Sequence, residues 1–270
     1  MKAAFFDLDK TIIARASMVA YGRPLLREGL LSTRALARAL AMQLIYLHYG
    51  AGEERMVKIR ERALATAKGA DRREVARLVR ETLGEVIEPI IFAEALDLIE
   101  SHRAEGHLVY IVSASPEEIV IPLSEYLGAD GAIASKAVVD EEGRYTGELE
   151  LYVYGTAKAD AIESLAAARG IDLSESYAYS DSITDLPMLE AVGHPYAVNP
   201  DRDLARTATE KGWDILHFTS PVRLRDRMPV PSGIQAMAFT GVALAAATGA
   251  AVYVWKHGSR RHPMKLRPAS

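Results

Sequence analysis

Residues 2–9, Lys-Ala-Ala-Phe-Phe-Asp-Leu-Asp, decide the fold. A short apolar run that ends in acids is typical of a buried parallel strand with polar groups at its carboxyl end. Asp7 and Asp9 are two positions apart, so both carboxylates face the same way in an extended chain. Close carboxylates repel each other unless a cation holds them. We therefore expect a cation site at the end of this first strand.

Strand and helix patterns alternate after Pro89. The sequence predicts buried strands at 107–112, 177–180 and 196–198, a hairpin at 131–139 and 145–154, and a last strand at 213–218. It predicts helices at about 91–104, 157–169, 184–192 and 201–211, and another that starts with Ser115 as N-cap and Pro116 as its first residue. This alternation predicts an α/β fold in which a doubly wound parallel sheet carries helices on both faces.

The stretch between the first strand and Pro89 has a different pattern. Apolar residues recur there at helical spacing, and Gly29, Gly50 to Gly52, and Gly69 divide the stretch into three or four helices. We therefore expect a core formed by residues 1–14 and 91–220, an inserted all-helical domain at 15–90, and a separate tail at 221–270.

Composition narrows the classes of function. The chain has 270 residues, a net charge of −4 and no cysteine, which excludes disulfides, thiolate metal sites and a cysteine nucleophile. Residues 91–220 are acidic, whereas 15–90 and 221–270 are basic. The basic flanks could attract anionic partners, or the helix faces exposed to solvent could simply differ in charge.

The first residues of the chain bear on its location. Two acids by position 9 argue against a signal peptide, so we expect a cytoplasmic catalytic part. We expect no nucleic-acid partner.

Four groups of polar residues fall at predicted strand or helix boundaries. Asp7 and Asp9 follow the first strand, Asp181 and Asp185 follow another, Ser113 ends a third, and Lys158 lies at a helix start. Each group alone has an ordinary structural explanation, such as a solvated turn, an N-cap or a surface lysine. Together they supply oxygen ligands for Mg²⁺, a cation, a hydroxyl and backbone donors for phosphate, and a carboxylate nucleophile. The set therefore predicts a phosphate site with a metal.

These residues carry a resemblance to the haloacid dehalogenase (HAD) superfamily, subfamily IB, in the branch similar to phosphoserine phosphatases. Residues 6–11 (Phe-Asp-Leu-Asp-Lys-Thr) resemble its first motif and residues 112–115 (Val-Ser-Ala-Ser) its second. Lys158 matches the third motif, and Ser180-Asp181-Ser182 with Asp185 matches the fourth. The resemblance covers residues 2–200 or so, and the helices at 15–90 resemble the family's mobile cap.

The resemblance implies a role for each residue. Asp7 attacks phosphorus and becomes an aspartyl phosphate, while Asp9 protonates the leaving oxygen and then activates water. Mg²⁺ is held by the side chains of Asp7 and Asp181 and the backbone carbonyl of Asp9. The remaining implied roles are phosphate binding by Ser113, Lys158 and Thr11, and support of Lys158 or the metal shell by Asp185.

The sequence departs from the family pattern at two places, and the second bears on the substrate. Ser180 replaces the glycine that commonly opens the fourth motif, and Ala14-Arg15-Ala16-Ser17 replaces a segment that carries the amine-binding glutamate of phosphoserine phosphatases. We therefore expect a small phosphomonoester other than a free amino acid phosphate. The alternatives are a lipid phosphate at the membrane, a phosphomutase reaction, and a membrane-tethered binding protein with a relict site.

The tail contains 233–255, Gly-Ile-Gln-Ala-Met-Ala-Phe-Thr-Gly-Val-Ala-Leu-Ala-Ala-Ala-Thr-Gly-Ala-Ala-Val-Tyr-Val-Trp, which has no charge. Its length is sufficient to span a bilayer, and Tyr253 and Trp255 suit an interface. Basic residues on both flanks leave the orientation ambiguous. Three interpretations stay open, namely a membrane anchor with lipid as a partner, a helix on the membrane surface, and a helix packed on protein.

Overall fold

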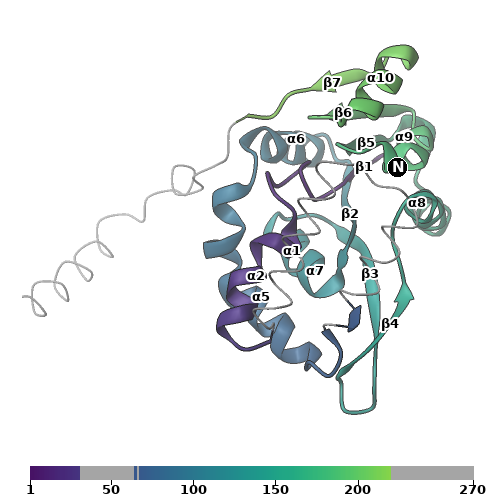
Figure 1. Cartoon of the computed structure of the whole chain (residues 1–270). Coiled ribbons are helices and arrows are strands. Elements are labelled where there is room, and N and C mark those ends of the chain that lie inside the picture. The colour runs from purple at the N-terminus through teal and green to yellow at the C-terminus, as the bar shows by residue number, and fades with distance from the viewer. Residues whose placement is uncertain (31–63, 66, 220–270) are drawn as a thin grey trace, which may run out of the picture. The chain divides into compact units, whose positions relative to one another are not determined.

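The computed structural model describes residues 1–30, 64–65 and 67–219, which form a seven-stranded sheet covered by helices (Figure 1). The strand order is β4-β3-β2-β1-β5-β6-β7. The strands are β1 (Ala3–Phe6), β2 (Leu108–Pro116), β3 (Gly131–Val139), β4 (Tyr145–Leu151), β5 (Tyr177–Ser180), β6 (His194–Val198) and β7 (Asp214–Leu216). All neighbours pair in parallel except β3 and β4, which form an antiparallel hairpin.

Helices account for most of the remaining described chain. They are α1 (Ser17–Ala20), α2 (Gly22–Arg27), α5 (Arg72–Val86), α6 (Ala93–Ala104), α7 (Glu117–Tyr126), α8 (Thr156–Arg169), α9 (Leu186–Glu190) and α10 (Arg202–Lys211). Short 3₁₀ turns cover Glu88–Ile90, Leu173–Glu175 and Ile183–Asp185.

Alternate residues of the central strand face two different cores. Phe6 belongs to a cluster with side chains of α5, α6 and α7, whereas Phe5 belongs to a cluster with side chains of α8, α9 and α10. Successive side chains of a strand point to opposite faces, so both faces of β1 are buried and its sequence is continuously apolar. The fold is therefore the predicted doubly wound α/β architecture.

One predicted helix start is wrong. Ser115 was expected as an N-cap with Pro116 as the first helical residue, but β2 continues to Pro116, and α7 starts at Glu117. The Ser115 side chain makes tertiary contacts instead of capping the helix, as the site below shows. Strand β2 is consequently longer than the predicted run at 107–112.

Two sequence predictions concern residues that lie largely outside the described part of the chain. Within the predicted cap range 15–90 the described residues form α1, α2, α5 and the first 3₁₀ turn, and 31–63 and 66 lie outside the described set. The apolar stretch 233–255 lies outside it as well. Among the residues that are described, no helix has the length and apolar character needed to cross a bilayer.

Candidate active site

The predicted site residues converge because three neighbouring parallel strands end at the same edge of the sheet. Asp7 directly follows β1, Ser113 lies in the carboxyl-terminal half of β2, and Asp181 directly follows β5. The backbone N–H of Asp7 donates to the carbonyl of Tyr179 at 2.9 Å, which continues the β1–β5 pairing up to the first acid. All three side chains are buried. This edge is where ligands bind in open α/β sheets.

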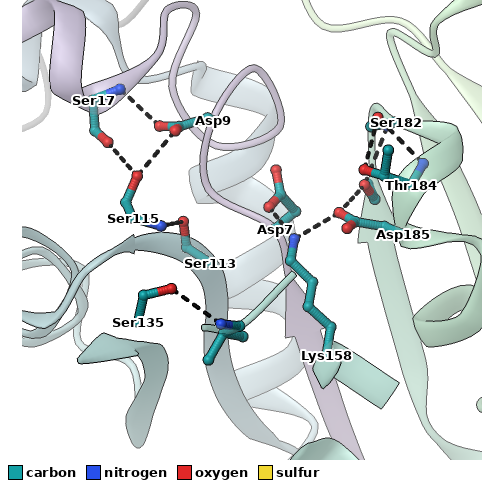
Figure 2. Close-up of polar contacts among 12 residues, drawn as sticks. Asp7, Asp9, Ser17, Ser113, Ser115, Ser135, Lys158, Ser182, Thr184 and Asp185 are labelled. Carbon is teal, nitrogen blue, oxygen red and sulfur yellow. Dashed lines mark hydrogen bonds and ion pairs between the residues drawn. The ribbon is translucent and has the colours of Figure 1, made fainter. Parts of the chain in front are cut away.

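Lys158 joins two of the acids directly (Figure 2). It lies in the first turn of α8, and its side chain is only 3% exposed. Its Nζ donates to Oδ1 of Asp7 at 2.6 Å and to Oδ2 of Asp185 at 2.7 Å. The hydroxyl of Ser180 donates to the same Asp185 oxygen at 2.7 Å. Two charge-assisted hydrogen bonds thus fix the ammonium beside the predicted nucleophile.

Burial sets the electrostatics of these acids. Desolvation raises the pKa of Asp7 to about 8; Lys158 lowers it, and the carboxylates of Asp185 and Asp181 raise it further. Desolvation likewise raises the pKa of Asp181 to about 6, which Lys10 opposes. Burial lowers the pKa of Lys158, but Asp185 and Asp7 outweigh it, so the net pKa is raised and the ammonium keeps its charge. Closely placed buried acids of this kind favour an added cation.

Asp9 has a separate set of partners. Its Oδ1 accepts from the backbone N–H of Ser17 at 2.7 Å, and its Oδ2 accepts from the hydroxyl of Ser115 at 3.1 Å. The Ser17 and Ser115 hydroxyls lie 2.8 Å apart, and the N–H of Ser115 donates to Oγ of Ser113 at 3.1 Å. In Figure 2 the Asp9 carboxylate points toward these serines, while the Asp7 side chain lies beside Lys158. Desolvation raises the pKa of Asp9, which suits an acid–base group.

Ser17 and Ser115 were not identified as site residues from the sequence. Ser17 lies in the segment that lacks the family's glutamate, and Ser115, the last residue of the second motif, is predicted from the sequence to be a helix N-cap. Ser115 lies two residues after Ser113, and Ser17 lies at the start of α1. These positions give a local signal, but only the fold brings both residues to Asp9.

Thr11 is fully buried, and its hydroxyl has no hydrogen-bond partner within the described part of the chain. A buried hydroxyl without a hydrogen-bond partner costs free energy, so a ligand that offered it an acceptor would be bound more tightly. Thr11 therefore retains an unused donor close in sequence to both motif-one acids.

The donor set fits Mg²⁺, which commonly takes one or two carboxylates together with water and phosphate oxygens. Asp7 and Asp181 lie at the ends of adjacent strands, and their raised pKa values reflect buried acids that a cation would stabilise. No group of three or more His, Asp or Glu side chains is gathered as a metal cluster among the described residues. The fit consequently rests on the two carboxylates of Asp7 and Asp181.

Comparison with known proteins identifies the family of this chain. The model of the haloacid dehalogenase-like hydrolases matches residues 4–190. A probable phosphatase of Mycobacterium tuberculosis (strain H37Rv) is 48% identical over 93% of this chain and 88% of its own length. A phosphoserine phosphatase of the same strain is 35% identical over 90% of this chain and 79% of its length.

A solved structure shares the fold. It is a phospho-aspartyl intermediate analogue of phosphoserine phosphatase, which superimposes with a TM-score of 0.59 at 20% identity and covers 84% of this chain and 99% of that one. The family match, the two relatives and the fold lead to one assignment. The chain belongs to the haloacid dehalogenase-like hydrolases and is one of their phosphatases.

Proposed function

We propose that this phosphatase hydrolyses a small phosphomonoester in a Mg²⁺-dependent reaction that passes through an aspartyl phosphate on Asp7. The observation that carries the proposal is the buried ammonium of Lys158, held between Asp7 and Asp185 at the strand end next to Asp181. A fixed cation beside a buried carboxylate is suited to the charge that spreads over phosphoryl oxygens during transfer.

The reaction divides into two balanced steps. In the first, a carboxylate oxygen of Asp7 forms a bond to phosphorus, the bond to the alcohol oxygen breaks, and Asp9 gives that oxygen its proton. In the second, Asp9 takes a proton from water, the hydroxide forms a bond to phosphorus, and the P–O bond to Asp7 breaks to release inorganic phosphate. The hydrogen bonds from Ser17 and Ser115 hold the Asp9 carboxylate for both steps.

Phosphate contacts follow from the same geometry. Lys158 and the Ser113 hydroxyl are proposed to bind the phosphoryl oxygens, and Thr11 supplies the unused hydroxyl described above. The metal is proposed to be held by the side chains of Asp7 and Asp181 with the backbone carbonyl of Asp9. When bound, Mg²⁺ would supply positive charge that neutralises the phosphate.

The substrate is proposed to be a small phosphomonoester other than phosphoserine, with selection by a cap formed by residues 15–90. The relative named phosphoserine phosphatase supports a phosphate ester of a small molecule. The segment 14–17 lacks an acid, so it offers no carboxylate to a substrate amine. An exposed arginine, Arg15, stands there instead.

The test is turnover of p-nitrophenyl phosphate with Mg²⁺ and with EDTA, followed by rapid acid quench with a ³²P-labelled ester. Wild-type protein should require Mg²⁺ and yield an acid-stable, hydroxylamine-sensitive label, and Asp7→Asn should give neither turnover nor label. Asp9→Asn should still be labelled, with both steps slower by about 10²–10⁴-fold. Near-normal turnover by Asp7→Asn would overturn the assignment. Transfer of the label to a second sugar or alcohol phosphate in preference to water would identify a mutase.

A further inference from the structure

Lys10 adopts a backbone conformation that costs energy. Its φ is +67°, and it is one of two non-glycine residues with positive φ in the described ranges, the other being Asn199. A side chain with a Cβ is disfavoured in this left-handed region, whereas glycine and asparagine are tolerated. The Lys10 N–H donates to the carbonyl of Ile13 at 2.7 Å, which closes the tight turn that follows Asp9. Strain of this kind, on the order of 1 kcal/mol or more, tends to occur at functional sites.

The side chain of Lys10 reaches the second predicted metal ligand. Its Nζ lies 3.5 Å from Oδ2 of Asp181, whose side chain is 10% exposed. The Lys10 side chain itself is 40% exposed, whereas that of Lys158 is 3% exposed. Of the cations near these acids, Lys158 is enclosed by two carboxylates at 2.6 and 2.7 Å and cannot withdraw without breaking both bonds. Lys10 makes a longer contact with Asp181 than Lys158 makes with either of its carboxylates.

The charges indicate what this contact does. Asp7, Asp9, Asp181 and Asp185 carry up to four negative charges, and Lys158 with Lys10 carries two positive charges. A divalent cation at Asp7 and Asp181 would balance the remainder, and it would share the Asp181 carboxylate with the Lys10 ammonium. Two cations at one carboxylate repel each other. Metal binding and the Lys10–Asp181 contact are therefore in competition.

We propose that Lys10 is a positioning residue whose ammonium holds Asp181 in the metal-free protein and withdraws when Mg²⁺ binds, so that it weakens metal affinity. This inference rests on the proposed function, because it takes Asp181 as a metal ligand. The lysine holds the buried carboxylate in place before the metal arrives.

The experiment measures metal binding rather than turnover. Mn²⁺, which prefers the same oxygen ligands, is titrated into substrate-free protein while the electron paramagnetic resonance signal of free Mn²⁺ is recorded, and Mg²⁺ is then added as a competitor. Lys10→Asn removes the charge and tolerates the left-handed backbone, Lys10→Gly removes charge and strain, and Lys10→Arg keeps the charge. Lys2→Gln is the matched control, because Lys2 pairs with Glu175 on the surface.

Lys10→Asn and Lys10→Gly should each bind Mn²⁺ and Mg²⁺ more tightly by up to about fivefold, the upper bound given by a loss of about 1 kcal/mol in a partly exposed ion pair. Lys10→Arg and Lys2→Gln should keep wild-type affinity, and the gain should shrink at high salt. Unchanged or weaker binding by Lys10→Asn, with normal binding by the wild type, overturns the Lys10 proposal alone. A gain in Lys10→Gly alone assigns the effect to strain and also overturns it. Absence of metal binding by the wild type overturns the proposed metal site and this inference together.

Discussion

The hydroxyl of Ser115 lies 3.1 Å from Oδ2 of Asp9, to which it donates a hydrogen bond. The other Asp9 oxygen accepts from the N–H of Ser17, the first residue of α1. Both contacts are to one carboxylate, so its orientation depends on β2 and on the first helix after the motif-one turn. A change in the position of α1 would therefore alter the orientation of the proposed acid–base group.

Replacing Ser115 with alanine should slow turnover while leaving substrate affinity nearly unchanged. A hydrogen bond to a charged group contributes about 1.5–3 kcal/mol, so we expect kcat to fall about tenfold or more. The loss should be greater for an alkyl phosphate than for p-nitrophenyl phosphate, because only the poor leaving group needs protonation by Asp9.

The matched control for that variant is Ser124→Ala. Ser124 is a buried serine of α7 whose hydroxyl donates to the carbonyl of Ile121 at 2.9 Å, with no contact to the acids in the described structure. It should keep the wild-type ratio of rates for the two esters. An equal loss for both esters in Ser115→Ala would contradict the positioning role and indicate a general packing defect.

Asp185→Asn should impair both stability and turnover. The substitution removes one of the two carboxylates that hold Lys158 and leaves an amide beside a buried ammonium. We expect the free energy of unfolding to fall by about 1.5–3 kcal/mol. Turnover should also fall, because Lys158 then has only Asp7 to orient it.

Chemical unfolding monitored by circular dichroism, together with rates for p-nitrophenyl phosphate, tests this expectation. Ser180→Ala provides the comparison, since it removes the neutral donor to Asp185 and leaves both ion pairs in place. If Ser180→Ala lowered stability as much as Asp185→Asn, the Lys158–Asp185 pair would contribute little.

The sequence predicts the centre of the sheet well because strand β1 is continuously apolar. The run that contains Phe5 and Phe6 is buried on both faces, and such runs are evident without any tertiary information. The sequence also predicts that Asp7 and Asp181 lie close together, because the carboxyl ends of parallel strands meet at the same edge of the sheet.

The sequence did not predict contacts in which a polar side chain has more than one choice of partner. Ser115 precedes a proline and a helix, which favours an N-cap locally, yet the Asp9 carboxylate is a stronger acceptor and draws its hydroxyl away. The left-handed backbone of Lys10 was equally unpredictable, because lysine has no preference for that region.

Gly193→Ala should destabilise the protein without touching the proposed active site. A Cβ at this position would overlap the carbonyl oxygen of Ser174, while the Gly193 N–H donates to the carbonyl of Leu173 at 2.8 Å. The backbone on one side must therefore move. We expect a loss of about 1–3 kcal/mol, as for other overpacked sites.

The control for this variant is Gly84→Ala in the interior of α5. An added Cβ there makes only an ordinary contact, 3.6 Å from Oε2 of Glu88, and alanine favours helix by up to about 1 kcal/mol. Thermal unfolding should place the Gly84→Ala midpoint at or above the wild-type value and that of Gly193→Ala below it. A wild-type midpoint for Gly193→Ala would show that the Leu173–Glu175 turn adjusts freely.

The last prediction concerns the dependence of stability on pH. His102, on α6, is buried, and its Nε2 lies 2.8 Å from the Tyr179 hydroxyl, while its Nδ1 lies 3.0 Å from Nδ1 of His107. Burial lowers the pKa of His102 to about 4, His107 lowers it as well, and Glu105 opposes both.

A lowered pKa means that the unfolded chain binds this proton more tightly than the folded chain. The stabilisation linked to neutral His102 is therefore complete above the unfolded pKa of about 6.5 and is lost as the pH falls from there toward 4.

The free energy of unfolding in urea, measured at intervals between pH 7.5 and 4.5, should decline over this window more steeply in the wild type than in His102→Gln. The variant should be less stable than the wild type at pH 7.5, and the gap between them should narrow as the pH falls. His217→Gln, at an exposed position, should follow the wild-type curve. Parallel curves for the wild type and His102→Gln would show that protonation of His102 is not linked to unfolding, which would contradict this prediction.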